Sequence, residues 1–137
     1  MTGKNPASVL AENEGAVRET LRGIYDAWAA NDADAFAASY VENATVVLPG
    51  TYKDGKNEVR NYMAAAFDGP LKGSQGIDEP QNVRFLDDNT AVVVSEAGIL
   101  MAGESELPDE RRVRATWVLS RQDGKWLVAA YHNCPAN

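Results

Sequence analysis

The sequence has few of the residues that most often carry enzyme chemistry. Its 137 residues include one histidine, His132, and one cysteine, Cys134. A lone cysteine excludes an internal disulfide, and no spacing of residues suggests zinc, calcium or a phosphate-binding loop. The dinucleotide fingerprint G-x-G-x-x-G is also missing, so we expect no metal, nucleotide or other cofactor.

Positive charge and long apolar runs are scarce too. The net charge of −7 opposes binding to nucleic-acid phosphates or to anionic membranes. No apolar run approaches the roughly 18 residues of a membrane span, and the first residues show no hydrophobic segment of a secretory signal. We therefore expect a cytoplasmic protein with no nucleic-acid or membrane partner.

The rest of the composition is that of an ordinary globular domain, with 45% apolar and 24% charged residues. The length predicts a single domain. Residues 1–10 show no periodicity and are expected to form a flexible tail, which leaves residues 11–137 as the domain.

Three helices are predicted in the first half of the chain. Apolar residues recur every three or four positions in residues 12–30, as in an amphipathic helix. Asp32 can cap a short second helix that runs through Phe36 to Tyr40. Gly55 precedes a third helix, with the sequence KNEVRNYMAAAF.

Extended segments dominate the second half. A short strand is predicted at ATVVL, and an irregular loop rich in glycine and proline at residues 69–80. Four successive strand candidates follow, with the sequences QNVRFL, TAVVVSEAGILM, RVRATWVLSR and KWLVAAYHN. Helices followed by a run of antiparallel strands predict an α+β fold.

Two-residue turns set the register of these strands. Asp88-Asn89 and Asp123-Gly124 suit hairpin loops because Asn, Asp and Gly tolerate positive φ. If Gln122 faces Lys125 across the second turn, alternate residues of the hairpin divide between two faces. The more apolar face carries Val113, Ala115, Trp117, Leu119, Trp126, Val128, Ala130 and His132, and the other carries Arg114, Thr116, Val118, Leu127, Ala129, Tyr131 and Asn133.

His132 is the first catalytic candidate. It belongs to the face that the helices are expected to cover, opposite Ala115 and diagonal to Trp117. The small residues Ala115 and Ala130 beside large rings leave a notch, so the imidazole would line a cavity and exchange a proton near neutral pH. The alternative is a core histidine bonded to a backbone carbonyl or to a tyrosine hydroxyl.

Glu96 is the carboxylate expected to act with this histidine. A turn at Asp88-Asn89 places Glu96 opposite Gln81 and on one face with several valines. Burial among apolar side chains raises the pKa of a carboxyl group, as a general acid or base requires. The alternative is an exposed glutamate beyond a bend at Gly98.

Aromatic residues are the candidates for substrate binding. Tyr25, Trp28, Tyr40 and Trp117 can form a wall for a planar or polyene ligand. The alternative is an ordinary aromatic core. Asn133, near the end of the last strand, completes the set of substrate-binding candidates.

The second face of the predicted sheet is apolar as well. The segments AVVV and LVAAY place apolar side chains on both faces, whereas a half-exposed strand alternates. No predicted helix remains to cover this face. We therefore expect a homodimer through the outer sheet face.

Three segments resemble the SnoaL-like branch of the nuclear-transport-factor-2-like superfamily. They are YDAWAANDADAFAASYVENATVVLPG, YKDGKNEVRNYMAAAF and GKWLVAAYHN, and the resemblance covers residues 11–134. Within this branch, the chain is most similar to the SgcJ/EcaC group of natural-product clusters, including enediyne polyketide clusters. The resemblance implies a cone-shaped curved antiparallel sheet wrapped around three N-terminal helices, a pocket at its wide end, and a dimer.

The superfamily includes ketosteroid isomerase, scytalone dehydratase and polyketide cyclases, alongside members that only bind. The resemblance implies a small-molecule-binding protein or tailoring enzyme that handles a hydrophobic polyketide intermediate by isomerisation, cyclisation or dehydration. The alternatives are a non-catalytic carrier that protects an unstable intermediate and a dimeric protein-interaction module. The catalytic aspartate of the isomerases has no assignable position here, and a single histidine excludes the histidine pairs of the dehydratase.

Overall fold

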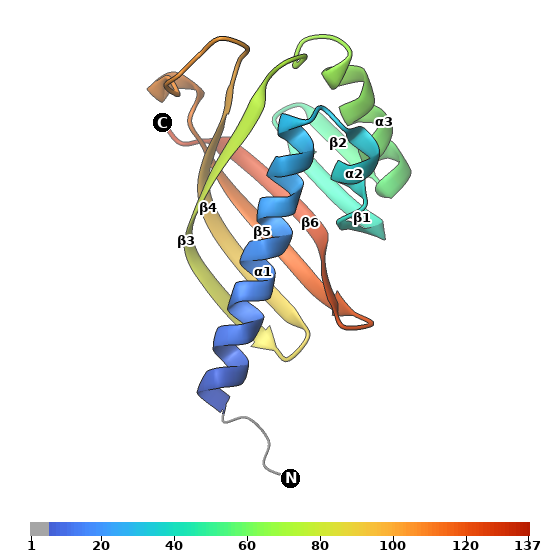
Figure 1. Ribbon diagram of the computed structural model, residues 1–137, viewed down its shortest axis with the longest axis vertical. Coiled ribbons are helices and arrows are strands. Elements are labelled where there is room, and N and C mark those ends of the chain that lie inside the picture. The colour runs from blue at the N-terminus through green and yellow to red at the C-terminus, as the bar shows by residue number, and fades with distance from the viewer. Residues whose placement is uncertain (1–5) are drawn as a thin grey trace.

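The computed structural model describes residues 6–137 and confirms the α+β class (Figure 1). Residues 1–5 of the expected tail lie outside the described residues, and residues 6–10 belong to the first helix instead of a tail. The elements are α1 (Pro6–Ala29), α2 (Ala33–Ala37), β1 (Tyr40–Leu48), β2 (Thr51–Asp54), α3 (Lys56–Phe67), β3 (Gln75–Asp87), β4 (Thr90–Leu100), the 3-10 helix η1 (Asp109–Arg111), β5 (Val113–Gln122) and β6 (Lys125–Pro135).

One curved sheet of six strands, in the order β2-β1-β6-β5-β4-β3, forms the body of the fold. Neighbouring strands are antiparallel except β1 and β6, which are parallel. The sheet is thus mainly antiparallel, as expected, with a parallel pair that the sequence did not predict. The helices lie on one face of the sheet, where α1 packs against β3 and β6, and α3 packs against β1 and β2 (Figure 1).

The helices begin and end for local reasons. Asp32 caps α2 as predicted, because its Oδ1 accepts a hydrogen bond from Ala35 N at 3.0 Å. The helix ends at Ala37, so that Tyr40 begins β1 instead of ending the helix. Within the described residues, no helix is both long enough and apolar enough to cross a membrane.

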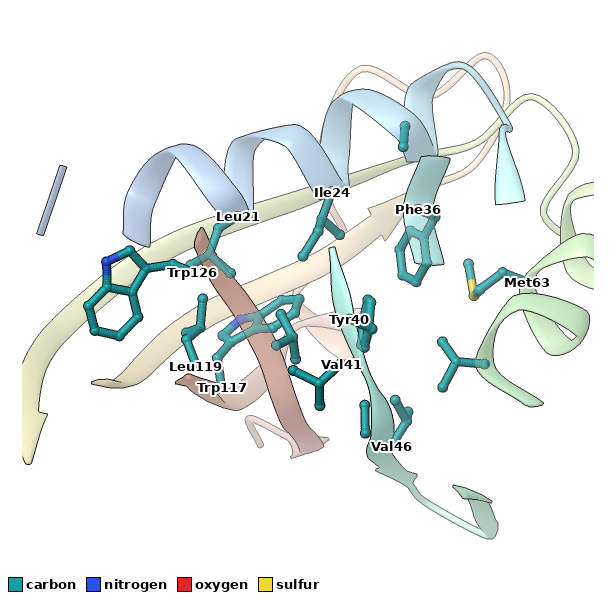
Figure 2. Close-up of a cluster of buried hydrophobic side chains, with 14 of the residues drawn as sticks. Leu21, Ile24, Phe36, Tyr40, Val41, Val46, Met63, Trp117, Leu119 and Trp126 are labelled. Atoms are coloured by element: carbon teal, nitrogen blue, oxygen red, sulfur yellow. The ribbon is translucent and has the colours of Figure 1, made fainter. Parts of the chain in front are cut away.

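A single hydrophobic core fills the space between the helices and the inner face of the sheet (Figure 2). The amphipathic stripe of α1 supplies one side of it, and β5 and β6 supply the other. Burial of each large apolar side chain stabilises the fold by about 1.5–3 kcal/mol. The stripe consists of Val17, Leu21, Ile24 and Ala27.

The β5–β6 hairpin turns where the sequence predicts. Gln122 pairs with Lys125, and both turn residues have positive φ, 51° at Asp123 and 79° at Gly124. A β-bulge at Ala129 then shifts the register of the rest of β6 by one residue. Leu119 pairs with Val128, but Val118 pairs with Ala130, so Ala129 has no partner on β5. Beyond this inserted residue, every side chain of β6 lies on the face opposite to the predicted one.

The bulge reverses the expected positions of two neighbours. Tyr131 pairs with Trp117 and faces the helices, whereas His132 pairs with Thr116 and is exposed on the outer face. The predicted orientation of His132 is therefore wrong. The predicted outward orientation of Tyr131 and Asn133 is wrong for the same reason.

The β3–β4 hairpin also turns at the predicted residues, with Asp87 paired to Thr90. Irregularities at Leu86 and Gln81 shift its register, so that Glu96 pairs with Glu79 instead of Gln81. The strand itself begins at Gln75, inside the segment expected to be an irregular loop. Pro80 is tolerated there because β3 is an edge strand.

Candidate functional site

A cavity of about 300 Å³ lies between the inner face of the sheet and the three helices. This volume is at the lower end of the range of roughly 300–1,000 Å³ that small-molecule sites occupy. Its walls are mainly apolar and aromatic, and charged side chains contribute at its rim. Residues from every helix and from five strands line it, among them Tyr25, Trp28, Phe36, Tyr40, Val46, Lys53, Tyr62, Met63, Ile99, Arg111, Trp117, Tyr131 and Asn133.

The structure brings together the five residues named as substrate-binding candidates. All five line the cavity, although their role in binding stays a prediction: Tyr25, Trp28, Tyr40, Trp117 and Asn133. The two catalytic candidates, His132 and Glu96, do not line it.

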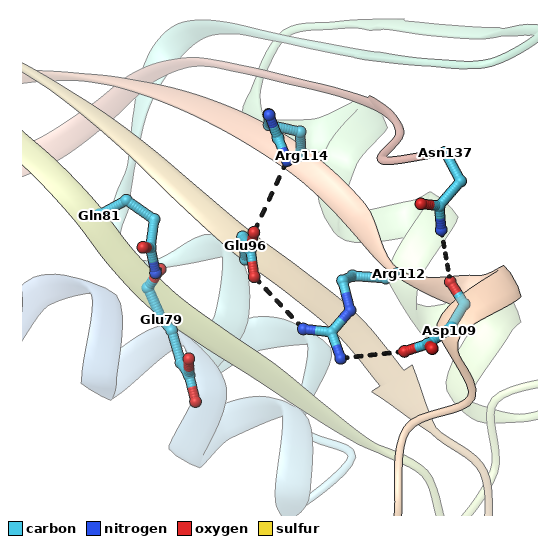
Figure 3. Close-up of polar contacts among 7 residues, drawn as sticks. All are labelled: Glu79, Gln81, Glu96, Asp109, Arg112, Arg114 and Asn137. Carbon is cyan, nitrogen blue, oxygen red and sulfur yellow. Dashed lines mark hydrogen bonds and ion pairs between the residues drawn. The ribbon is translucent and has the colours of Figure 1, made fainter.

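Glu96 lies on the outer face of the sheet, where it forms ion pairs instead of facing a cavity. Its carboxylate is 3.3 Å from Arg112 Nη1 and 3.6 Å from Arg114 Nη2 (Figure 3). Arg112 also reaches Asp109, at 3.3 Å. Glu96 shares its face with Val92 and Val94 as predicted, but the irregular register of β3 places Val83 and Phe85 on the inner face. The contacts of Glu96 are those of a surface ion-pair network.

Three tyrosines give the cavity its polar region. Tyr131 stands beside Trp117, with ring centroids 4.3 Å apart, and its Oη accepts a hydrogen bond of 2.9 Å from Asn133 Nδ2. Tyr131 lies close enough to Tyr25 and Tyr40 to raise the pKa of both hydroxyls. No side chain among the described residues forms a hydrogen bond with the Tyr40 hydroxyl, so both Tyr40 and Tyr131 have a proton to donate.

Burial keeps these phenols in the neutral form. Desolvation raises the pKa of Tyr131 to about 12, although the hydrogen bond from Asn133 opposes this effect. The pKa values of Tyr40 and Tyr25 are raised mainly by desolvation and, to a smaller extent, by the nearby Tyr131. Asp78 raises the pKa of Tyr25 further. At neutral pH the cavity therefore presents hydroxyl donors, not phenolate bases.

Asp78 is a half-buried carboxylate that the sequence did not single out. Its Oδ2 accepts a hydrogen bond from Tyr25 Oη at 3.2 Å and another from Trp117 Nε1 at 3.1 Å. Both donors line the cavity, whereas Asp78 lies behind them. Burial raises the pKa of Asp78, and the nearby Ser95 hydroxyl together with the hydrogen bonds from Trp117 and Tyr25 reduces the increase.

The second oxygen of this carboxylate has room for another donor. Asp78 Oδ1 and Ser95 Oγ are both buried, and neither has a partner in hydrogen-bonding geometry within the described part of the chain. Ser95 nevertheless acts on Asp78 electrostatically, since its hydroxyl lowers the pKa of that carboxyl. An acceptor beside a rotatable hydroxyl can form a bond with a small rearrangement.

Gly76 allows Tyr25 to reach Asp78. It lies two residues before Asp78 on β3, and a Cβ atom at this position would come within 2.4 Å of the Tyr25 ring. A rigid ring cannot give way at that distance without moving as a whole. The glycine that favoured a loop in the sequence is therefore required for the packing of the site.

Trp28 is held in place at the other side of the aromatic wall. Its Nε1 donates to Ser74 Oγ at 2.9 Å, and Ser74 Oγ in turn donates to Leu71 O at 2.6 Å. Its ring stacks with Tyr25 at a centroid distance of 6.1 Å.

No group of three potential metal ligands occurs in residues 6–137.

Comparison with known proteins agrees with this architecture. A crystal structure of a domain with a cystatin-like fold from Nostoc punctiforme PCC 73102 has a TM-score of 0.84 and 25% identity, over 98% of this chain and 80% of that one. An NTF2-like protein from Novosphingobium aromaticivorans scores 0.81 with 17% identity, over 93% and 84% of the two chains.

A candidate scytalone dehydratase from Novosphingobium aromaticivorans DSM 12444 has a TM-score of 0.79 and 14% identity, over 96% of this chain and 89% of that one. Among curated proteins, none matches the sequence. The sequence profile of the SnoaL-like domain matches residues 17–136, which include every strand and nearly all of the cavity wall. The chain belongs to the family of SnoaL-like domains, which have the nuclear-transport-factor-2-like fold.

Proposed function

We propose that this protein binds a small, largely apolar molecule that carries a carbonyl or hydroxyl oxygen. The observation that carries the proposal is the pair of free hydroxyl donors, Tyr40 and Tyr131, inside an apolar cavity of about 300 Å³. The apolar walls favour a hydrophobic body, and the two donors favour one acceptor oxygen. A polyketide-type intermediate, of the kind handled in the SgcJ/EcaC group, has both features.

The Tyr131 hydroxyl is prepared to donate. Because Asn133 already donates to Tyr131 Oη, the phenol proton is left for the ligand. A hydroxyl that accepts one hydrogen bond becomes a stronger donor in the next. Asn133 is thus a positioning residue, and Tyr131 is the residue that contacts the ligand oxygen.

The same donors suit isomerisation, cyclisation or dehydration at a position next to a carbonyl. Each of these reactions develops negative charge on the carbonyl oxygen, which fixed hydroxyl donors stabilise. Asp78 is the partly buried carboxylate that is hydrogen-bonded to this wall. It can accept the Tyr25 hydroxyl proton while Tyr25 Oη takes a proton from the ligand, so that the tyrosine stays neutral and the proton removed from the ligand is balanced at Asp78.

A non-catalytic carrier is the second candidate. Asp78 is screened from the cavity by Tyr25 and Trp117, and the tyrosines that face the ligand stay protonated. Such a cavity shelters a reactive molecule without supplying a base.

Binding of 2-acetylnaphthalene and of 2-ethylnaphthalene, followed by tryptophan fluorescence, tests the proposal. The two probes have similar shape, but only the ketone has an acceptor oxygen. Tyr131→Phe should weaken ketone binding by about 2- to 10-fold and leave the hydrocarbon unchanged. The exposed His132→Ala variant is the control. Equal losses for both probes, or no binding of either, would contradict the proposal.

Exchange of the acetyl protons of 2-acetylnaphthalene in D₂O separates the enzyme from the carrier. An enzyme of this class accelerates the exchange over buffer, and Tyr131→Phe and Asp78→Asn each reduce the acceleration. A carrier binds the ketone and leaves the exchange rate at the buffer value.

The outer face of the sheet supports a homodimer as part of the proposal. Val92, Val118 and Ala130 lie side by side across β4, β5 and β6, on the face of the sheet opposite to the helices. A second copy would cover this strip. Val118→Glu should convert a dimer to monomers in sedimentation velocity, and an unchanged sedimentation coefficient would exclude this interface.

A further inference from the structure

We infer that the ligand of this cavity carries a carboxylate, which binds Lys53 at the rim. The inference rests on the proposed function and narrows it to one substrate class: small apolar monocarboxylates with a carbonyl or hydroxyl oxygen at the far end.

The register of the sheet places Lys53 on the inner face. Lys53 pairs with Val46, which is buried and lines the cavity, whereas its neighbours Tyr52 and Asp54 are exposed. A side chain between two outward residues points inward because strand alternation has a period of two. A lysine on the inner face of a mainly apolar cavity therefore needs an explanation.

An aromatic ring holds the ammonium group in position. Lys53 Nζ lies 5.2 Å from the centroid of the Tyr62 ring, and both residues line the cavity. A cation–π contact orients a cation without neutralising its charge. The ammonium group can therefore still pair with an anion.

The other cations of the rim already have partners. Arg111 forms a bidentate pair with Glu104, with contacts of 2.6 and 2.5 Å, and Arg112 pairs with Glu96 and Asp109. Within residues 6–137, no carboxylate lies within 4.0 Å of Lys53 Nζ. Lys53 is thus the cation of the described rim that has no ion-pair partner.

Carboxylates near Lys53 in the sequence are engaged elsewhere. Glu58 accepts a hydrogen bond from Asp54 N at 3.0 Å, and Glu42 lies 3.9 Å from Lys56 Nζ. Glu110 also contributes to the rim, but it is exposed and acts on Arg111. The chain has a net charge of −7, so the free cation at this rim is not a consequence of a general excess of positive charge.

The register of the sheet separates Lys53 from Tyr131, so that these two residues can bind opposite ends of one molecule. Lys53 pairs with Val46 on β1, and Val46 pairs with Tyr131 on β6. Two strand spacings, about 10 Å across the sheet, separate the backbones of Lys53 and Tyr131. A bicyclic acid with a carbonyl group at the opposite end spans this distance.

The matched probes are 6-acetyl-2-naphthoate and its methyl ester, measured by tryptophan fluorescence or calorimetry. In the wild-type protein we expect the acid to bind about 10- to 100-fold more tightly than the ester, because a charge-assisted bond forms only with the acid. Added salt should weaken the binding of the acid and leave the binding of the ester unchanged.

Lys53→Met should remove the preference for the acid and leave ester binding unchanged, whereas Lys53→Arg should retain most of the preference. Lys125→Met, in the exposed β5–β6 turn, makes the same change of net charge and should have no effect. Equal binding of acid and ester to the wild-type protein would overturn this inference and leave the proposed function intact. Failure of both probes to bind would overturn the two together, and an equal loss of both in Lys53→Met would assign Lys53 a structural role only.

Discussion

The two faces of the sheet use polar groups in opposite ways. The inner face combines apolar side chains with neutral hydroxyls, indoles and one half-buried carboxylate, Asp78. The outer face carries ionised groups in pairs, such as Glu96 with Arg112. Adjacent residues belong to different environments, since Tyr131 lines the cavity and His132 is exposed. Residue type alone therefore does not identify the functional face. The single inserted residue Ala129 decides whether Tyr131 or His132 lies on the inner face.

Truncation of the central inner residue should have the largest effect. Trp117 is 2% exposed, and Trp117→Ala removes its ring, its contact with Tyr131 and a donor to Asp78. We expect a loss of about 3–5 kcal/mol in the free energy of unfolding, measured with urea. Val118→Ala, at the next residue on the outer face, is the control and should cost much less.

Gly76→Ala tests whether the packing of Tyr25 depends on the missing Cβ. The new methyl group would meet the Tyr25 ring at 2.4 Å, so the ring must move away from Asp78. Overpacking of this kind costs about 1–3 kcal/mol in stability. A weaker affinity for 2-acetylnaphthalene should accompany the loss. An unchanged stability and affinity would show that Tyr25 has more freedom than its contacts indicate.

Asp78→Asn tests whether the pKa of the Asp78 carboxyl is raised, through the pH dependence of the free energy of unfolding. Because the pKa of Asp78 is raised in the folded protein, the folded state keeps a proton that the unfolded state loses above about pH 4. This contribution to stability is present at low pH and is lost as the pH rises through the raised value. The wild type should therefore lose stability relative to Asp78→Asn between acid and neutral pH.

The difference between the two proteins is the informative quantity in this experiment. Exposed carboxyls whose pKa is lowered by hydrogen bonds, such as Glu104, make both proteins less stable in acid, and their effect cancels in the difference. A difference that does not change with pH would mean that Asp78 titrates alike in the folded and unfolded chains.

Glu96→Gln should have a small effect. Its ion pairs with Arg112 and Arg114 are partly exposed, and such pairs contribute about 0.2–1 kcal/mol. Added salt should reduce the difference from wild type in thermal unfolding. Ligand affinity should not change, and a change would place Glu96 in contact with the cavity after all.

His132→Ala should have the smallest effect of these substitutions. The imidazole is exposed beside Thr116, so we expect a change in stability within about 0.5 kcal/mol. Probe affinity and proton exchange should stay at wild-type values. A large loss of exchange would restore the histidine as a catalytic candidate.

The sequence predicted those features that local chemistry controls. The bounds of α3, the Asp32 cap and both hairpin turns follow from helix periodicity and from residues that tolerate positive φ. Four aromatic residues of the cavity, Tyr25, Trp28, Tyr40 and Trp117, were predicted because large rings at helical or strand spacing must pack together, whereas Tyr131 was assigned to the outer face.

The faces of the strands were not predicted, because a bulge has no strong signal in a segment such as LVAAYHN. Ala129 and Ala130 are both small, so the sequence does not indicate at which residue of β6 the alternation between the two faces changes. Asp78 was missed because Gly76 and Pro80 made its strand look like a loop, although both residues have packing or edge-strand roles. These features depend on partners that are distant along the chain.

The parallel pairing of β1 with β6 has a consequence for biosynthesis. The final strand in chain order occupies an interior place in the sheet, between β1 and β5. Before residues 125–135 are synthesised, the sheet lacks the strand that joins β1 to β5. Tyr25 and Tyr40 then lie in a cavity wall that is missing the part contributed by β6. The cavity is therefore incomplete until residues 125–135, which contribute Tyr131 and Asn133 to its wall, have joined the sheet.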